Sequence, residues 1–218
     1  MNSQQLEKSI INTLAYFDLF NHPLTKEELY DFLWQPTIVS YNEFLDKLSS
    51  CPNIETKYSY YFLANRKEII EIRRARLLGN EKKIKKAVRA ANKIKSIPFI
   101  KAIFICNTVG AEQSDQQSDI DFLIITTPKR IWITRFFSNI ILRLFGLRAY
   151  GQSSKDRVCL SFYLDTDNLD LADIRLVSDD IYLAYWLNQL LPIYDPDDLY
   201  KKMLSTNSWI KTFIANID

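Results

Sequence analysis

Two runs of apolar residues, FIKAIFIC at 99–106 and DIDFLIITT at 119–127, flank a polar loop. Both runs have the length of a strand and are apolar almost throughout, as strands are when both faces of their sheet are buried. A third run of this kind at 157–165 follows a helical segment at 128–147. Strands that alternate with a helix in this order predict an α/β unit with a buried sheet.

The end of the chain completes this unit with further helical patterns. We expect closing helices at 179–195 and 197–218, where apolar residues recur at helical spacing. Hydrophobic residues make up 47% of the 218-residue chain and charged residues 25%, which is the composition of a globular protein with a substantial core.

The first 65 residues carry the signals of three short helices followed by a hairpin. Residues 6–20 place apolar side chains at helical spacing. Capping boxes, in which Ser or Thr is followed three residues later by Glu, mark two further helix starts at 25–28 and 40–43. Residues 53–66 are aromatic and alternate in polarity, as in a hairpin. This order predicts a winged-helix-like domain at 1–65 and makes the whole chain an α+β protein.

Residues 66–95 form a helical segment with a large excess of positive charge. Its 12 Lys or Arg against 3 Glu give +9, which leaves −7 for the rest of a chain whose net charge is +2. The dipeptide Gly79-Asn80 predicts a break into two helices. We expect a basic connector at 66–96 that binds RNA or an acidic partner. The alternative is a solvated basic face that packs near the acidic remainder.

The third helix of a winged-helix domain is the element that reads DNA, and here it has few cations. Lys47 stands against Glu43 and Asp46, and the expected wing offers only Lys57. Because DNA readers need cations to neutralise phosphates, we expect no sequence-specific DNA binding. A structural or protein-docking role is favoured for this domain.

Asp119 and Asp121 begin the second apolar strand. Side chains alternate along a strand, so these two carboxylates point to the same face, roughly 6.5 to 7 Å apart. They repel each other unless a cation lies between them, and Mg²⁺ binds through carboxylates together with substrate phosphates. The pattern predicts a divalent metal site for Mg²⁺ or Mn²⁺. The alternative is a solvated junction between loop and strand.

The arrangement of strand, polar loop, Ser118 and Asp-Ile-Asp resembles the nucleotidyltransferase superfamily of polymerase-beta type. The likeness covers roughly residues 97–165 at motif level and, for bacterial proteins with this domain, most of the chain. It implies a small mixed-sheet nucleotidyltransferase α/β domain with C-terminal helices at 97–218. It also implies that Asp119 and Asp121 are catalytic, hold the metal and orient a nucleoside triphosphate for transfer of a nucleoside monophosphate to an unidentified acceptor.

The resemblance assigns further residues to nucleotide binding. The Gly-Ser of the family motif falls on Asn107 and Thr108, where the Thr hydroxyl replaces that of Ser and Asn tolerates positive φ. An alternative register puts the motif glycine at Gly110. The remaining candidates for binding the triphosphate are Ser118, Lys129 and Arg130.

A third carboxylate lies on a later strand in active members of the superfamily. The matching position here is Ser161, which is no strong base or metal ligand at neutral pH. Asp165 is a substitute candidate, because alternation puts it on the face of Ser161; its alternative role is to begin the next loop. Besides a transferase, we therefore consider a degenerate nucleotide-binding or partner-binding regulator, and a DNA-binding regulator.

We expect a cytoplasmic protein with no membrane partner. The first residues, MNSQQLEKSI, lack the basic and apolar regions of a signal peptide. The longest apolar stretch, 131–147, contains Arg135 and Arg143 and is short for a membrane span. The cysteines are scattered without a C-x-x-C motif, which is typical of free thiols in a reducing compartment. They are Cys51, Cys106 and Cys159.

Overall fold

The chain forms two compact units, Met1–Ala75 with Ser208–Asp218 and Arg76–Asn207. The described residues of the computed structural model are 3–149, 154–176 and 179–216. Helices and strands are mixed in both units, so the predicted α+β class is confirmed. The C-terminal segment differs from the expected domain at 97–218 because it joins the first unit, where the Asn216 amide donates to the Tyr30 carbonyl at 2.9 Å.

Helices and a small antiparallel sheet make up the first unit. The sheet has the strand order β1-β3-β2, and both predicted capping boxes are present at the starts of α2 and α3. Three helices followed by the β2-β3 hairpin agree with the predicted order, whereas strand β1 between the first two helices was not predicted. The assignment to the winged-helix class stays a prediction. The elements are α1 (Ser3–Asp18), β1 (Leu24–Thr25), α2 (Lys26–Asp31), α3 (Tyr41–Ser50), β2 (Ile54–Lys57) and β3 (Tyr60–Leu63).

One continuous helix, α4 (Ile69–Ile94), replaces the two helices expected around Gly79-Asn80. The prediction of a break is wrong because tertiary contacts hold Asn80 inside the helix. The Asn80 side chain is buried, donates to the Val109 carbonyl at 3.0 Å and accepts from the Ser114 hydroxyl at 2.8 Å. These bonds outweigh the weak helix propensity of Gly and Asn.

The second unit is built on a four-stranded mixed sheet of order β6-β5-β4-β7. Strand β4 is antiparallel to β5 and β7, and β5 is parallel to β6, with α6 as the crossover. After α4 the elements are β4 (Ile100–Cys106), α5 (Asn107–Gly110), β5 (Ile120–Thr126), α6 (Ile131–Leu144), β6 (Val158–Asp165), η1 (Ala172–Ile174), α7 (Ile181–Asn188), β7 (Leu191–Tyr194) and α8 (Leu199–Thr206). A final turn, η2 (Ser208–Thr212), belongs to the first unit.

Strand β7 lies where the sequence predicted one helix at 179–195. The helix ends at Asn188, and a few residues later β7 pairs with the side of β4 that β5 leaves open, with Leu191 opposite Ile105. Pro192 lies in this short edge strand, a position where a missing N–H is tolerated. The helical prediction failed here because a free strand edge binds the segment.

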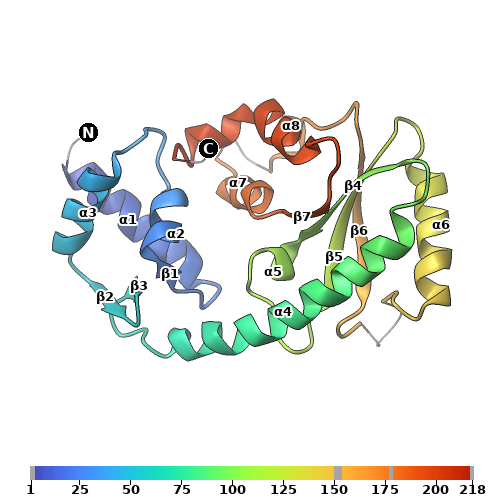
Figure 1. The fold of residues 1–218 in the computed structure, drawn as a ribbon. Helices are drawn as coiled ribbons and strands as arrows, with labels where there is room; N and C mark the ends of the chain where they lie inside the picture. Colours follow the sequence, from blue (N-terminus) through green and yellow to red (C-terminus); the bar gives the residue numbers. More distant parts are fainter. Residues whose placement is uncertain (1–2, 150–153, 177–178, 217–218) are drawn as a thin grey trace. The chain divides into compact units, whose positions relative to one another are not determined.

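Helices cover both faces of this sheet, which explains the unbroken apolar runs of β4 and β5. Helices α4 and α6 pack on one face around Phe122 and Ile124, whereas α7 and α8 lie on the other, with Tyr200 of α8 against Phe104 (Figure 1). No helix among the described residues combines the length and the apolar character needed to cross a bilayer.

Substitution of two glycines tests this description of α4 and of the turn after β4. Gly79→Ala should raise the free energy of unfolding by about 0.5–1 kcal/mol, because alanine favours a helix interior and no neighbouring described atom lies within 4 Å of the new Cβ. Gly110→Ala should lower it, because its Cβ would lie 2.9 Å from the Gln189 carbonyl oxygen. Urea unfolding followed by circular dichroism measures both; a destabilised Gly79→Ala would contradict a continuous α4.

Candidate functional site

Asp119 and Asp121 lie at the start of β5, beside the end of β4. Asp119 directly precedes the strand and Asp121 is its second residue, opposite Cys106 on β4 and Cys159 on β6. One ligand atom from each of Asp119, Asp121 and Cys159 lies within 4.8 Å of the other two. The two carboxylates and a thiol thus converge on one point at the sheet end.

Ser161 joins this group from β6. Its hydroxyl donates a hydrogen bond to a carboxylate oxygen of Asp121. The register of β5 and β6 shifts here, so that Leu123 pairs with Phe162 rather than with Ser161. A bulge of this kind re-aims side chains. The position that the resemblance assigns to a third carboxylate is therefore beside the aspartates and is occupied by a hydroxyl.

The electrostatics of the pair favour a bound cation. Burial raises the pKa of Asp119 above its ordinary value of 3.8, and the neighbouring charge of Asp121 raises it further. Burial also raises the pKa of Cys106, with Asp121 adding to the effect, so this thiol stays protonated beneath the site. Two carboxylates that disfavour each other's charge are stabilised when a divalent ion binds between them.

The donor set fits a divalent cation. Asp119 and Asp121 offer carboxylate oxygens, the ligands that Mg²⁺ prefers, and Cys159 offers sulfur, which softer ions accept. The choice of Mg²⁺ or Mn²⁺ stays a prediction. Cys159 was not predicted from the sequence as a site residue. Its position two residues before Ser161 on the same strand could have indicated it.

A buried lysine of α4 holds the loop that leads into Asp119. Lys83 is 2% exposed, and its ammonium donates to the Ser118 carbonyl at 2.5 Å and to Asp156 Oδ1 at 2.7 Å. Lys86 donates to the other oxygen of Asp156 at 2.7 Å. Lys83 therefore anchors the chain directly before the aspartates, and Lys86, about one turn further along α4, helps to hold Asp156 beside it.

Ser118 takes part in the local structure of this loop. Its backbone N–H and its hydroxyl donate to Asp115 Oδ1 at 2.7 and 2.8 Å, and the Asp115 N–H donates to the Ser118 hydroxyl at 2.9 Å. This turn is of the kind that Asp and Ser side chains stabilise. Ser118 thus lies next to the aspartates, with its hydroxyl engaged in shaping the loop.

Asn107 and Thr108 begin α5, directly after the β4 residue that pairs with Asp121. Asn107 has φ 53°, so the tolerance of Asn for positive φ is used here, as the sequence predicted. Its side-chain oxygen accepts from Trp186 Nε1 at 2.8 Å. Thr108 is exposed. The structure therefore brings both residues to the end of the sheet where the aspartates lie.

Asp165 lies away from the aspartates. It pairs with Thr126, five residues along β5 from Asp121, about 16 Å at the usual strand rise. The register shift also turns Asp165 to the opposite face, so the prediction that it shares a face with Ser161 is wrong. Its carboxylate accepts from the Asn168 amide at 2.7 Å and anchors the following turn.

Lys129 and Arg130 follow the far end of β5, so they also lie away from Asp121. The Lys129 backbone N–H donates to Asp165, and the Arg130 guanidinium lies over the ring of Phe99, 5.2 Å from its centroid. The structure does not bring them to the aspartates. The prediction relied on the closeness of these residues to Asp121 in the sequence. It failed because the seven-residue strand β5 is extended and carries them to the opposite end of the sheet.

An apolar pocket lies on the face of the sheet to which Asp121 points. It has a volume of about 220 Å³, and Phe162 and Trp186 meet in it edge to face, 5.4 Å between ring centroids. Asn107 joins it to the start of α5. Its lining residues are Asn107, Leu123, Phe162, Tyr163, Leu164, Leu171, Ile174, Tyr182, Leu183 and Trp186.

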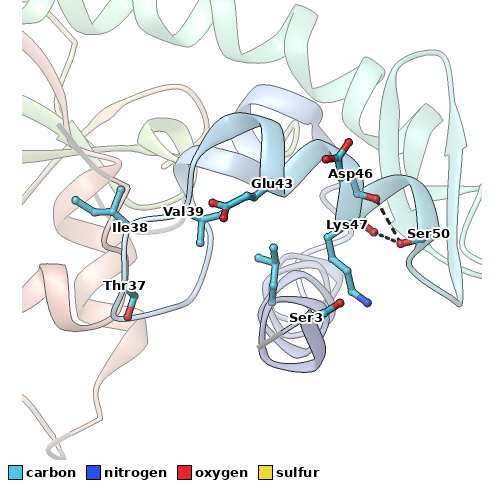
Figure 2. Close-up of a pocket in the computed structure, with 9 residues that line it drawn as sticks. Ser3, Thr37, Ile38, Val39, Glu43, Asp46, Lys47 and Ser50 are labelled. Atoms are coloured by element: carbon cyan, nitrogen blue, oxygen red, sulfur yellow. Dashed lines mark hydrogen bonds between the residues drawn. The ribbon is translucent and has the colours of Figure 1, made fainter. Parts of the chain in front are cut away.

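A second hollow of about 460 Å³ lies in the first unit, beside α3. Figure 2 shows Lys47 extending from α3 toward Ser3. Lys47 forms an ion pair with Glu7 at 2.5 Å, and Glu43 caps its own helix through Ser40. These charges are used within the fold, and the expectation that α3 does not read DNA stays a prediction.

The basic segment at 66–95 is partly internal. Arg73 is 3% exposed and pairs with Glu28, with Nη1 to Oε2 at 2.7 Å, while Lys83 pairs with Asp156. These two cations hold the fold together and do not face a partner. Binding of RNA or an acidic protein stays a prediction for the exposed cations of α4.

Comparison with protein-family models and with curated proteins finds no match to this chain.

The raised pKa of Asp119 makes a prediction about stability and pH. A carboxyl whose pKa is raised on folding destabilises the fold once it is ionised, above its folded pKa, and has no such effect below its unfolded pKa. Asp119→Asn should therefore stabilise the metal-free protein at neutral pH, and this gain should vanish as the pH falls below about 4. Thermal unfolding between pH 3 and pH 8 measures it; an equal gain in exposed Asp167→Asn would contradict the account.

Lys83→Met tests the anchor of the loop. It removes a buried ammonium from Asp156 and from the Ser118 carbonyl, so the free energy of unfolding should fall by about 1–3 kcal/mol. The matched variant Lys85→Met breaks an exposed pair with Glu81 on the same helix and should cost less than about 0.5 kcal/mol. Chemical denaturation compares them, and similar losses in both would remove Lys83 from this role.

Proposed function

We propose that this protein is a divalent-metal-dependent nucleotidyltransferase that moves a nucleoside monophosphate from a nucleoside triphosphate to an acceptor. The observation that supports this most is the convergence of Asp119 and Asp121 at a strand mouth, beside the start of α5. Same-face carboxylates at such a point are suited to hold Mg²⁺ or Mn²⁺ together with phosphate oxygens.

Each side chain near the pair has a role in this proposal. Asp119 and Asp121 would hold the metal, which when bound neutralises charge on the triphosphate. Thr108 would donate its exposed hydroxyl to a phosphate oxygen. The Lys83 anchor would keep Asp119 in place without contacting substrate, because its ammonium is already bonded to Ser118 and Asp156.

In the proposed transfer, an acceptor hydroxyl oxygen forms a bond to the α-phosphorus. The bond from that phosphorus to the bridging oxygen breaks, and pyrophosphate leaves with the electron pair. The proton of the acceptor passes to solvent, since Ser161 stands where a carboxylate base would be expected. The aromatic lining of the pocket around Phe162 and Trp186 suits stacking with a nucleobase.

The second candidate is a protein that binds nucleotide without transfer and acts as a regulator. Ser161 specifically favours it, because a hydroxyl is neither a base nor a metal anchor at neutral pH. The DNA-binding alternative draws less support, because Lys47 of α3 is engaged with Glu7.

Calorimetric titration of ATP and GTP, with and without Mg²⁺, tests the proposal. Binding should depend on Mg²⁺ and fall at least about 100-fold in Asp119→Asn/Asp121→Asn, because both metal carboxylates are lost. Asp167→Asn/Asp198→Asn is the matched control, since it removes two exposed carboxylates elsewhere and asparagine tolerates the left-handed backbone of residue 198.

The outcomes separate the candidates. Mg²⁺-dependent binding with pyrophosphate release on addition of acceptor mixtures supports the transferase. Binding without pyrophosphate release in any mixture favours the regulator. Equal binding in the two double variants, or none in the wild-type protein, would contradict a nucleotide site at Asp119 and Asp121.

A further inference from the structure

Helix α6 exposes its more apolar face. Its buried positions are Thr134, Ser138 and Leu142, two of them hydroxyl residues. Its outward positions are large and apolar, with Trp132 82% and Leu144 79% exposed. The outward apolar residues are Trp132, Ile133, Phe136, Phe137, Ile140 and Leu144.

A helix on a protein surface normally buries its apolar stripe and presents polar residues to water. Here the stripe extends over three helical turns of the outward face, which makes it a contiguous patch and not a set of scattered side chains. Such a patch is stable in water only at a cost in free energy. It therefore indicates a surface that is covered when the protein acts.

The charged side chains of the segment that contains α6 are all positive. Residues 122–155 contain no Asp or Glu. Lys129 and Arg130 are exposed at the start of α6 and Arg143 is exposed at its end. Lys93 of α4 lies over the ring of Phe145, 4.2 Å from its centroid, beside the same end. The apolar face is thus bordered at both ends by cations.

We propose that the outward face of α6 binds the surface of an anionic lipid bilayer, which departs from the expectation of no membrane partner that the sequence alone gave. A helix with Trp, Phe and Leu side chains bordered by Lys and Arg inserts its apolar face at the level of the headgroups, while the cations contact lipid phosphates. Helix α6 lies on the membrane and does not cross it: its 14 residues extend about 21 Å, against a hydrocarbon core of about 30 Å.

Other occupants fit these observations less well. Nucleic acid would match the cations and the aromatic rings, but Ile133, Ile140 and Leu144 offer bases nothing to stack on. A second copy would bring Lys129 and Arg130 of one chain near the same set or near Arg143 of the other, with no carboxylate on this segment to offset the repulsion. An anionic lipid surface can bury the aliphatic side chains and can also pair its phosphates with the cations.

The topology keeps this surface apart from the aspartates. Helix α6 covers one face of the sheet and α7 lies on the other (Figure 1). Leu142 of α6 belongs to the core cluster of its face, whereas Asp121 shares the face of Leu123, which lines the pocket under α7. Docking through α6 would leave Asp119 and Asp121 open to solvent. The inference therefore stands whether or not the protein transfers nucleotides.

Sedimentation of the full chain with vesicles tests the proposal. We expect binding to phosphatidylcholine vesicles that contain about one-third phosphatidylglycerol, weak binding to pure phosphatidylcholine, and loss at high salt. The bound fraction should fall at least about ten-fold in Trp132→Ser/Phe136→Ser and in Ile140→Ser/Leu144→Ser. The control Leu19→Ser/Leu176→Ser, which removes exposed leucines elsewhere, should bind like the wild type.

Circular dichroism establishes that each variant is folded, and two independent variants of the face guard against a folding defect in one of them. Absence of binding by the folded wild-type chain to anionic vesicles would overturn the proposal. So would binding that both α6 variants retain. A dimer seen by light scattering that the same variants dissociate, or binding of single-stranded RNA in place of vesicles, would assign the face to a different partner.

Discussion

The rest of this structure depends on the pairing of β5 with β4 on one side and β6 on the other. That pairing puts Cys106 and Cys159 opposite Asp121. A shift of one residue along β6 lets the Ser161 hydroxyl reach the Asp121 carboxylate. Because backbone hydrogen bonds of a buried sheet are costly to leave unmade, this register is held firmly. The sheet therefore positions Asp121, and Asp119 directly precedes the strand at the end of a loop that Lys83 anchors.

Helix α4 shows how buried polar groups position a site that they do not enter. Asn80 bonds the turn after β4, and Lys83 bonds the loop before β5. Both side chains are satisfied within the fold, so their burial specifies one arrangement of those two loops. Part of the positive charge of this helix is thus used inside the fold. A count of its Lys and Arg residues therefore overstates the number of cations that a partner could contact.

The two faces of the second unit's sheet carry different kinds of surface. One face carries the aspartates and the aromatic pocket under α7, where polar and apolar groups are combined as in a ligand site. The other is covered by α4 and α6, and the outward side of α6 is more apolar than its buried side. A reaction at the aspartates and docking through α6 would be compatible, since the two sites lie on opposite faces of the sheet.

The sequence by itself determined the three long strands β4, β5 and β6, because short unbroken apolar runs bounded by polar loops fit a buried sheet. It also determined the capped helix starts and the approach of Asp119 to Asp121. Only the tertiary structure decided the rest. Pairing with β4 made β7 a strand, contacts of Asn80 kept α4 whole, and the register of β6 brought Cys159 and Ser161 to the aspartates while it removed Asp165. Local patterns specify elements, whereas register and contact between distant segments are properties of the folded chain.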